Sequence, residues 1–301
     1  MKKAIITGAT GLVGMAVAKY FAKCGVETLC IGKRNLSFKE LDKYFDANVN
    51  YLSLSMENLS MLAEKIDLID WSPGDECVFF NFAWRGYSKL TDGSFSDQIR
   101  NAIHASEAVR IAKNLGCIKF VNAGSLEETN IERFFTNSNN VNINSSQPDY
   151  ALAKLLSRDM CTMVAYLEKI DYVHTRMSVP LSSDLSGGTY VAESLRKIYR
   201  RLPIEEPLNM QKFDITLLDD IARAYYLIGF KGKNKANYYI GTSKVATLAQ
   251  HFKNFDKICK NKNNEVENFT FDFENEIFNT LDIQKDTGFT ALLSMQDIIK
   301  K

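Results

Sequence analysis

The chain has 301 residues, a formal net charge of +1, and 46% hydrophobic against 24% charged residues. This composition is ordinary for a globular protein and predicts one large domain, or one domain with a smaller lobe. The balanced charge gives no overall attraction toward nucleic acid or an anionic membrane, so we expect neither partner. A small molecule is the expected ligand.

Cysteine use and the amino terminus favour a soluble cytoplasmic protein. The six cysteines are scattered without a CxxC pair, as in reduced cytosolic proteins. Two lysines near the amino terminus precede only a short apolar stretch, unlike a signal peptide, and no apolar run of about 18 residues follows. We therefore expect no membrane span, and we expect no metal site.

Short apolar runs alternate with longer amphipathic segments along the first two-thirds of the chain. The expected strands cover 3–7, 27–31, 49–54, 77–82, 118–122 and 172–176, and the expected helices cover 12–22, 59–69, 98–115 and 151–167. Every residue of the run 77–82 except Asn81 is apolar, which is typical of a strand buried on both faces of a parallel sheet. The alternation predicts an α/β fold with a doubly wound, Rossmann-type parallel sheet.

Polar segments divide the rest of the chain. Residues 129–149 are rich in Asn and Ser and predict a long loop ahead of Tyr150. The segment 182–188 predicts a boundary, after which Asp219 and Asp220 open an apolar helix that runs to Ile228, with an aspartate as its cap. A strand at 238–240 and two amphipathic helices around a turn at 260–264 follow.

These segments predict two parts. A dinucleotide-binding domain spans residues 1–176 and is completed by about 212–242. A smaller substrate-binding lobe takes about 177–211 and 243–301.

A glycine-rich segment joins the first expected strand to the first helix. Gly8, Gly11 and Gly14 stand in the context that a dinucleotide-binding turn requires, where the backbone approaches a pyrophosphate at a helix amino terminus. The full string at 7–14, Thr-Gly-Ala-Thr-Gly-Leu-Val-Gly, resembles the extended short-chain dehydrogenase/reductase family. The resemblance places the following residues at the cofactor: Gly8, Thr10, Gly11, Leu12, Val13 and Gly14.

The end of the second strand bears on the choice of cofactor. Gly32-Lys33-Arg34 stands where NAD enzymes usually carry an acid for the ribose 2′-hydroxyl. An acid would repel a 2′-phosphate, whereas an arginine can bind it, so we predict NADP(H) contacted by Lys33 and Arg34. NAD(H) is the alternative cofactor, and solvated turn residues are the alternative interpretation. The resemblance implies further cofactor contacts from Ser55, Met56, Phe82, Ala83, Trp84 and Val179.

Three residues form the expected catalytic set. Tyr150 and Lys154 lie four positions apart and share one face of a helix. A phenol has a pKa of about 10, and an adjacent ammonium favours its ionised form. Ser125 follows the carboxyl end of a strand, where ligands gather in open α/β sheets, and can hold a substrate oxygen. In the resembled family such a tyrosine is the acid or base of hydride transfer, and the lysine also bonds the nicotinamide ribose.

The resembled family includes 4-epimerases, 4,6-dehydratases and 4-ketoreductases of nucleotide sugars. Dehydratases carry Asp-Glu where this chain has Leu126-Glu127, and epimerases usually keep the acidic second-strand residue. His174 lies inside an expected strand and is assigned to the core, not to catalysis. We therefore predict NADPH-dependent reduction of a nucleotide-linked 4-keto-6-deoxyhexose at C4.

Two alternatives stay open: a nucleotide-sugar 4-epimerase using NAD, and a non-catalytic NADP-sensing regulator. The helices 98–115 and 151–167 pair across subunits in many relatives, so the resemblance also implies a homodimer.

Overall fold

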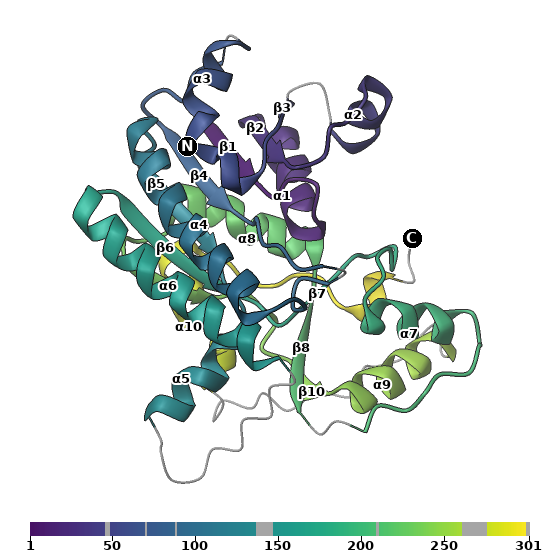
Figure 1. The fold of residues 1–301 in the computed structure, drawn as a ribbon. Coiled ribbons are helices and arrows are strands. Elements are labelled where there is room, and N and C mark those ends of the chain that lie inside the picture. The colour runs from purple at the N-terminus through teal and green to yellow at the C-terminus, as the bar shows by residue number, and fades with distance from the viewer. Residues whose placement is uncertain are drawn as a thin grey trace.

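The computed structural model describes residues 1–45, 49–69, 71–87, 89–136, 147–208, 211–260 and 276–298. Figure 1 shows a large sheet covered by helices on both faces and a smaller lobe beside it. The main sheet contains β1 (Lys3–Thr7), β2 (Glu27–Gly32), β3 (Val49–Ser53), β4 (Cys77–Asn81), β5 (Lys119–Ala123), β6 (Asp171–Arg176) and β9 (Ala236–Tyr239).

All neighbouring strands of the main sheet pair in parallel, in the order β3-β2-β1-β4-β5-β6-β9. The six strands predicted from 3–7 to 172–176 are confirmed to within a residue at either end. The strand predicted at 238–240 is β9, which begins two residues earlier and ends one residue earlier. The strand order reverses between β1 and β4, and ligands of open α/β sheets bind outside the carboxyl ends of the strands at such a point.

Helices form a layer on each face of this sheet. The helices are α1 (Leu12–Lys23), α2 (Phe38–Tyr44), α3 (Leu62–Asp67), α4 (Phe95–Asn114), α5 (Glu128–Thr136), α6 (Pro148–Glu168) and α8 (Leu218–Lys231). On one face α4 packs against α6, and on the other α1 packs against α8. The predicted helix 59–69 is divided between a 3-10 turn, Met56–Met61, and α3.

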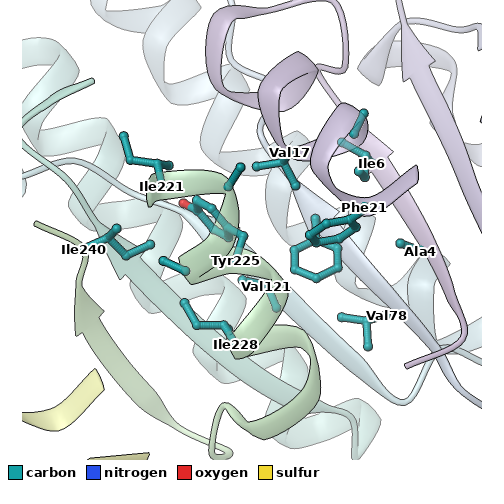
Figure 2. Close-up of a cluster of buried hydrophobic side chains, with 14 of the residues drawn as sticks. Ala4, Ile6, Val17, Phe21, Val78, Val121, Ile221, Tyr225, Ile228 and Ile240 are labelled. Carbon is teal, nitrogen blue, oxygen red and sulfur yellow. The ribbon is translucent and has the colours of Figure 1, made fainter. Parts of the chain in front are cut away.

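The core between α1, α8 and the sheet is rich in aromatic residues. Figure 2 shows side chains of α8, including Tyr225, facing Val17 and Phe21 of α1. The rings of Phe21 and Phe80 meet edge to face with centroids 5.0 Å apart. The Tyr225 hydroxyl is also bonded to Thr175 Oγ1 at 2.7 Å, so this core reaches the carboxyl end of β6.

The smaller lobe has its own three-stranded sheet, in the order β10-β8-β7. Its elements are β7 (Val179–Leu181), α7 (Tyr190–Tyr199), β8 (Lys212–Leu217), β10 (Val245–Thr247) and α9 (Leu248–Lys260). The helix α10 (Leu281–Thr287) follows along the chain and packs against α8 of the large domain. The predicted return segment 212–242 is therefore shared, since β8 joins the small sheet while α8 and β9 complete the large one. Asp214 of β8 links both, because its carboxylate accepts from the Tyr239 hydroxyl at 2.9 Å.

Two local predictions are wrong. A loop was predicted over 129–149, but α5 occupies Glu128–Thr136, where Ile131 packs against α6 and Glu132 pairs with Arg158 at 2.9 Å. Residues 137–146 of that segment, and 261–264 of the predicted turn at 260–264, lie outside the described residues.

The aspartate cap of α8 is the second error, because its N-cap is Leu217 and no described side chain caps it. The carboxylate of Asp220 instead accepts the backbone N–H groups of Leu292 and Leu293 at 2.9 and 2.8 Å. Within the described ranges, every helix is too short or too polar to cross a membrane.

Candidate functional site

The glycine loop packs tightly against the segment that leaves β4. Gly8 has a φ of +67°, and a Cβ there would lie 2.7 Å from the backbone nitrogen of Ala83. A Cβ at Gly14 would lie 2.4 Å from the Gly8 carbonyl oxygen. The loop therefore requires glycine at both positions for conformational and steric reasons.

The amino terminus of α1 opens onto this loop. Its N-cap is Gly11, no side chain of the described residues caps it, and its first turn has no acid. The first bond within the helix runs from Met15 N to Gly11 O at 3.0 Å, so the N–H groups of Leu12, Val13 and Gly14 precede it. These donors and the positive end of the helix dipole fit the pyrophosphate of a dinucleotide.

The end of β2 lies beside the same loop. A Cβ at Gly32 would lie 3.0 Å from Thr10 Cγ2 and 2.8 Å from the Tyr51 hydroxyl. That hydroxyl donates to the Arg34 carbonyl at 2.7 Å, and the Arg34 guanidinium carbon lies 5.2 Å from the Tyr44 ring centroid. Two tyrosines that the sequence did not single out thus hold Arg34 beside the glycine loop, while Lys33 is exposed.

The remaining predicted cofactor residues follow strand ends. Ser55 and Met56 begin the 3-10 turn after β3, and Phe82, Ala83 and Trp84 follow β4. The Phe82 ring packs edge to face on Tyr225 at 4.7 Å. Val179 begins β7, where the small sheet starts.

Ser125 and Tyr150 meet at the carboxyl end of β5. Tyr150, in the first turn of α6, is only 8% exposed. Burial raises the pKa of Tyr150 to about 12, the negative charges of Glu128 and Glu127 also raise it, and a hydrogen bond with Ser125 lowers it. The phenol therefore keeps its proton at neutral pH and can donate it.

Lys154 lies one turn further along α6 and is also buried. Its Nζ donates to the Ala123 carbonyl at 2.8 Å, and it lies 3.8 Å from the centroid of the Trp84 ring but 5.9 Å from that of Tyr150. Burial lowers the pKa of Lys154 to about 8, against the charge of Glu128, which raises it. The ammonium thus contacts a carbonyl and an indole face beside the phenol.

Several polar residues that the sequence did not predict support this edge of the sheet. Thr7 Oγ1 donates to Asn81 Oδ1 at 2.6 Å, and Asn81 Nδ2 donates to Asn122 Oδ1 at 2.9 Å. This buried chain joins the ends of β1, β4 and β5. Each of these polar residues ends an apolar run, and a polar residue at the carboxyl end of a buried strand is the signal that could have found them.

Gln98 and Glu128 were also missed. Trp84 Nε1 donates to Gln98 Oε1 at 2.8 Å, and the Ser125 N–H donates to Glu128 Oε1 at 2.7 Å. Both partners are fully buried, whereas glutamine and glutamate are mostly exposed in proteins. No sequence pattern distinguishes them from surface residues.

A family model described as the NAD dependent epimerase/dehydratase family matches residues 4–241. The chain belongs to this family. That membership confirms the resemblance carried by the glycine string and the Ser, Tyr and Lys set. No curated protein matches the sequence.

Solved structures with the same fold include a UDP-glucose 4-epimerase from Thermotoga maritima, in a structure with UDP-glucose. It is 17% identical with a TM-score of 0.73, and the match covers 99% of this chain and 96% of that one. The enzyme WbmF from Bordetella bronchiseptica, in complex with NAD+ and UDP, is 16% identical with a TM-score of 0.73, covering 100% and 90%.

A UDP-glucuronic acid 4-epimerase from Bacillus cereus, a tyrosine-to-phenylalanine mutant in complex with NAD, is 15% identical with a TM-score of 0.72. The match covers 99% of this chain and 96% of that one. At these identities the likeness establishes the fold alone.

Proposed function

We propose that this protein reduces the C4 ketone of a nucleotide-linked 4-keto-6-deoxyhexose with NADPH. The observation that carries the proposal is the meeting of Ser125 and Tyr150 at the carboxyl end of β5, with Lys154 on the same helix. The glycine loop after β1 lies at the same edge of the sheet, at the point where the strand order reverses. Redox chemistry and cofactor binding would thus share the carboxyl edge of the main sheet.

The residues have distinct roles in this reaction. When bound, the nicotinamide supplies the hydride that adds to C4. The Ser125 hydroxyl holds the C4 oxygen, and the Tyr150 hydroxyl donates its proton to that oxygen as the carbonyl becomes an alcohol. Lys154 holds a positive charge beside the phenol and bonds the nicotinamide ribose.

The preference for NADP(H) rests on the end of β2. Lys33 and Arg34 are exposed there, and the Tyr44 ring and Tyr51 hydroxyl hold Arg34 in place. A guanidinium can bind a 2′-phosphate through two parallel hydrogen bonds, and the residue directly after Gly32 is a lysine and not an acid that would repel the phosphate.

A nucleotide sugar is the proposed substrate, bound between the carboxyl edge of the main sheet and the smaller lobe. Val179 and the Ser178 hydroxyl, which accepts from the Asp214 N–H at 3.2 Å, connect the catalytic edge to that lobe. Similar structures with UDP-glucose or UDP support this substrate class.

A nucleotide-sugar 4-epimerase using NAD is the second candidate. Two of the similar structures are 4-epimerases, one of them in complex with NAD. An epimerase returns the hydride to the sugar and consumes no cofactor, whereas a reductase consumes one NADPH for each sugar.

One experiment separates these candidates. The protein is purified, its released cofactor is identified by mass spectrometry, and it is incubated with NADPH and a panel of nucleotide-linked 4-keto sugars. Our proposal expects little retained cofactor and oxidation of NADPH matched by formation of a C4 alcohol. Retained NAD with C4 inversion of a nucleotide hexose would identify the epimerase, and cofactor binding without any turnover would identify the regulator.

We also propose a homodimer formed through α4 and α6. Exposed apolar side chains occur on both helices: Ile103 at 41%, Met163 at 60%, Tyr166 at 69% and Leu167 at 61%. Sedimentation velocity of Met163→Asp should show monomers where the wild type shows dimers. Tyr199→Asp is the control, because Tyr199 is an exposed residue of α7, and it should leave the dimer intact.

A further inference from the structure

A buried carboxylate and a buried imidazole lie directly behind the catalytic serine. Glu128, in the first turn of α5, and His174, in β6, are 0% and 1% exposed. Glu128 Oε1 accepts from the Ser125 N–H at 2.7 Å, and its Oε2 lies 2.9 Å from His174 Nε2. Burying a charge is costly unless it is paired and hydrogen-bonded. Here the hydrogen bonds of the carboxylate run to the Ser125 amide and to His174.

Gly124 allows this pair to reach the serine loop. A Cβ at position 124 would lie 2.2 Å from Glu128 Oε1 and 2.3 Å from His174 Nε2. Any other residue would force the pair away from the Ser125 amide. The exit of β5, the start of α5 and the strand β6 thus fit together in this arrangement only with glycine at position 124.

The hydrogen bonds also fix the proton on the imidazole. Burial opposes ionisation of Glu128, but His174, the Ser125 amide and Arg176 outweigh it and hold the pKa of the carboxyl below its ordinary value. An ionised carboxylate only accepts, so Nε2 of His174 must carry a proton. Nδ1 faces the Tyr172 hydroxyl at 3.1 Å, which holds the ring on its other side.

We propose that Glu128 and His174 are a positioning pair for the site described above: they hold the Ser125 loop against Tyr150 and keep a negative charge beside Lys154. This inference rests on the proposed function, because positioning is meaningful only if Ser125 and Tyr150 act on a substrate. Neither member of the pair takes part in proton or hydride transfer. The pair acts through the serine backbone and through its charge.

The charge affects two groups in the same direction. Glu128 raises the pKa of Lys154, on which Cys161 of α6 also acts, and it raises the pKa of Tyr150, on which Glu127 also acts. A neutral residue at position 128 would therefore lower both pKa values. Both groups act in their protonated forms, so activity is lost as the pH rises through the pKa of Lys154, and the alkaline limb of the pH profile would move toward lower pH.

Glu128→Gln tests the pair, because the amide preserves size and removes charge. Its matched control is Glu132→Gln, one turn further along α5, whose side chain is 41% exposed and pairs with Arg158. The first readout is the imidazole ¹⁵N NMR spectrum. The chain has only three histidines, and the spectrum of His174→Gln assigns the resonance of His174.

The wild type should show His174 with a proton on Nε2. In Glu128→Gln the Ser125 N–H requires the amide oxygen as its acceptor, so the amide NH2 group faces Nε2 of His174 and donates to it. Neutral His174 should therefore change to the Nδ1–H tautomer, while Glu132→Gln keeps the wild-type spectrum. Neutral His174 with its proton on Nδ1 in the wild type would overturn the proposal without any variant. This readout needs no turnover, so it decides the arrangement of the pair even if the proposed reaction fails.

The second readout is the pH profile of NADPH-dependent turnover. In Glu128→Gln kcat should fall on the order of 10- to 100-fold, with KM little changed and the alkaline limb at lower pH. Glu132→Gln should match the wild type. A profile of Glu128→Gln with an unshifted alkaline limb would overturn the positioning role. Absence of turnover in the wild type would instead overturn the proposed function and leave the NMR result standing.

Discussion

The ammonium of Lys154 lies 3.8 Å from the centroid of the Trp84 ring, within the range of a cation–π contact. The same indole meets the Tyr150 ring edge to face, with centroids 5.9 Å apart and an interplanar angle of 82°. Its Nε1–H is bonded to Gln98, which is itself fully buried. One aromatic side chain after β4 therefore contacts both proposed catalytic residues of α6.

Replacing Trp84 tests this contact. Trp84→Leu removes the π face and about 0.5–2 kcal/mol of stabilisation of the ammonium. The pKa of Lys154 should then fall below its value of about 8. The alkaline limb of the kcat profile should move to lower pH in Trp84→Leu and much less in Trp84→Phe, which keeps an aromatic face. Equal kcat–pH profiles in both variants would show that the ring only packs against Lys154 and does not stabilise its charge.

We predict that the burial of Lys154 lowers the free energy of unfolding at neutral pH. Its pKa of about 8 in the folded state lies below the value of about 10.4 in an unfolded chain, so the unfolded state binds more protons between these pH values. Wild-type stability should therefore rise with pH across this interval.

Lys154→Met should be inactive yet more stable than the wild type at pH 7, by about 1–3 kcal/mol, with a gain that shrinks above about pH 8. Urea unfolding at several pH values measures both effects. A Lys154→Met protein less stable than the wild type at neutral pH would show that the contacts with Ala123 and Trp84 outweigh the burial of the charge.

Much of the fold could be predicted from the sequence because the strands of a parallel sheet are buried on both faces. Runs such as Cys77–Phe80 are continuous in apolar residues, and a glycine string with fixed spacing follows only the first of these strands. The helix α5 could not be predicted in this way. Its polar sequence resembles a loop, and contacts with distant residues stabilise it, among them Glu128 with His174 and Glu132 with Arg158.

The same distinction between local pattern and distant contacts applies to the proposed site. Ser125, Tyr150 and Lys154 could be found because their spacing is local or follows a strand end. The partners of Lys154 could not be found, since Trp84 lies 70 positions away along the chain and its approach depends on how α6 packs against α4 and β5. The effect of Lys154 on Tyr150 was overestimated from spacing alone, because the ammonium is directed at Ala123 and Trp84.

Arg34→Ala tests the predicted cofactor choice. The substitution should weaken NADPH binding by about 10- to 100-fold, since a charge-assisted bond contributes about 1.5–3 kcal/mol, and should change NADH binding little. Titration of nicotinamide fluorescence measures both affinities. Lys43→Ala, an exposed cation on nearby α2, should leave both unchanged. Equal losses for NADPH and NADH would contradict a 2′-phosphate contact.

A pair of glycines separates loop conformation from loop packing. Gly8 and Gly25 both have positive φ, at +67° and +77°, but no described atom lies within 4 Å of a Cβ placed at Gly25. Gly25→Ala should cost about 1–2 kcal/mol, from the left-handed conformation alone. Gly8→Ala should cost more and abolish cofactor binding, because its Cβ collides with backbone atoms of Phe82 and Ala83. Thermal unfolding with and without NADPH distinguishes the two outcomes.

The central claim is that Tyr150 and its neighbours promote hydride transfer to a sugar carbon. NADPH deuterated at the nicotinamide C4 position tests it most directly, with a nucleotide-linked 4-keto-6-deoxyhexose as substrate and NMR of the product. We predict that the wild type places deuterium at C4 of the sugar and that Tyr150→Phe, still folded and still binding NADPH, slows this transfer by about 10²- to 10⁴-fold. Full transfer by Tyr150→Phe, or no deuterium in any product of the wild type, would contradict the account.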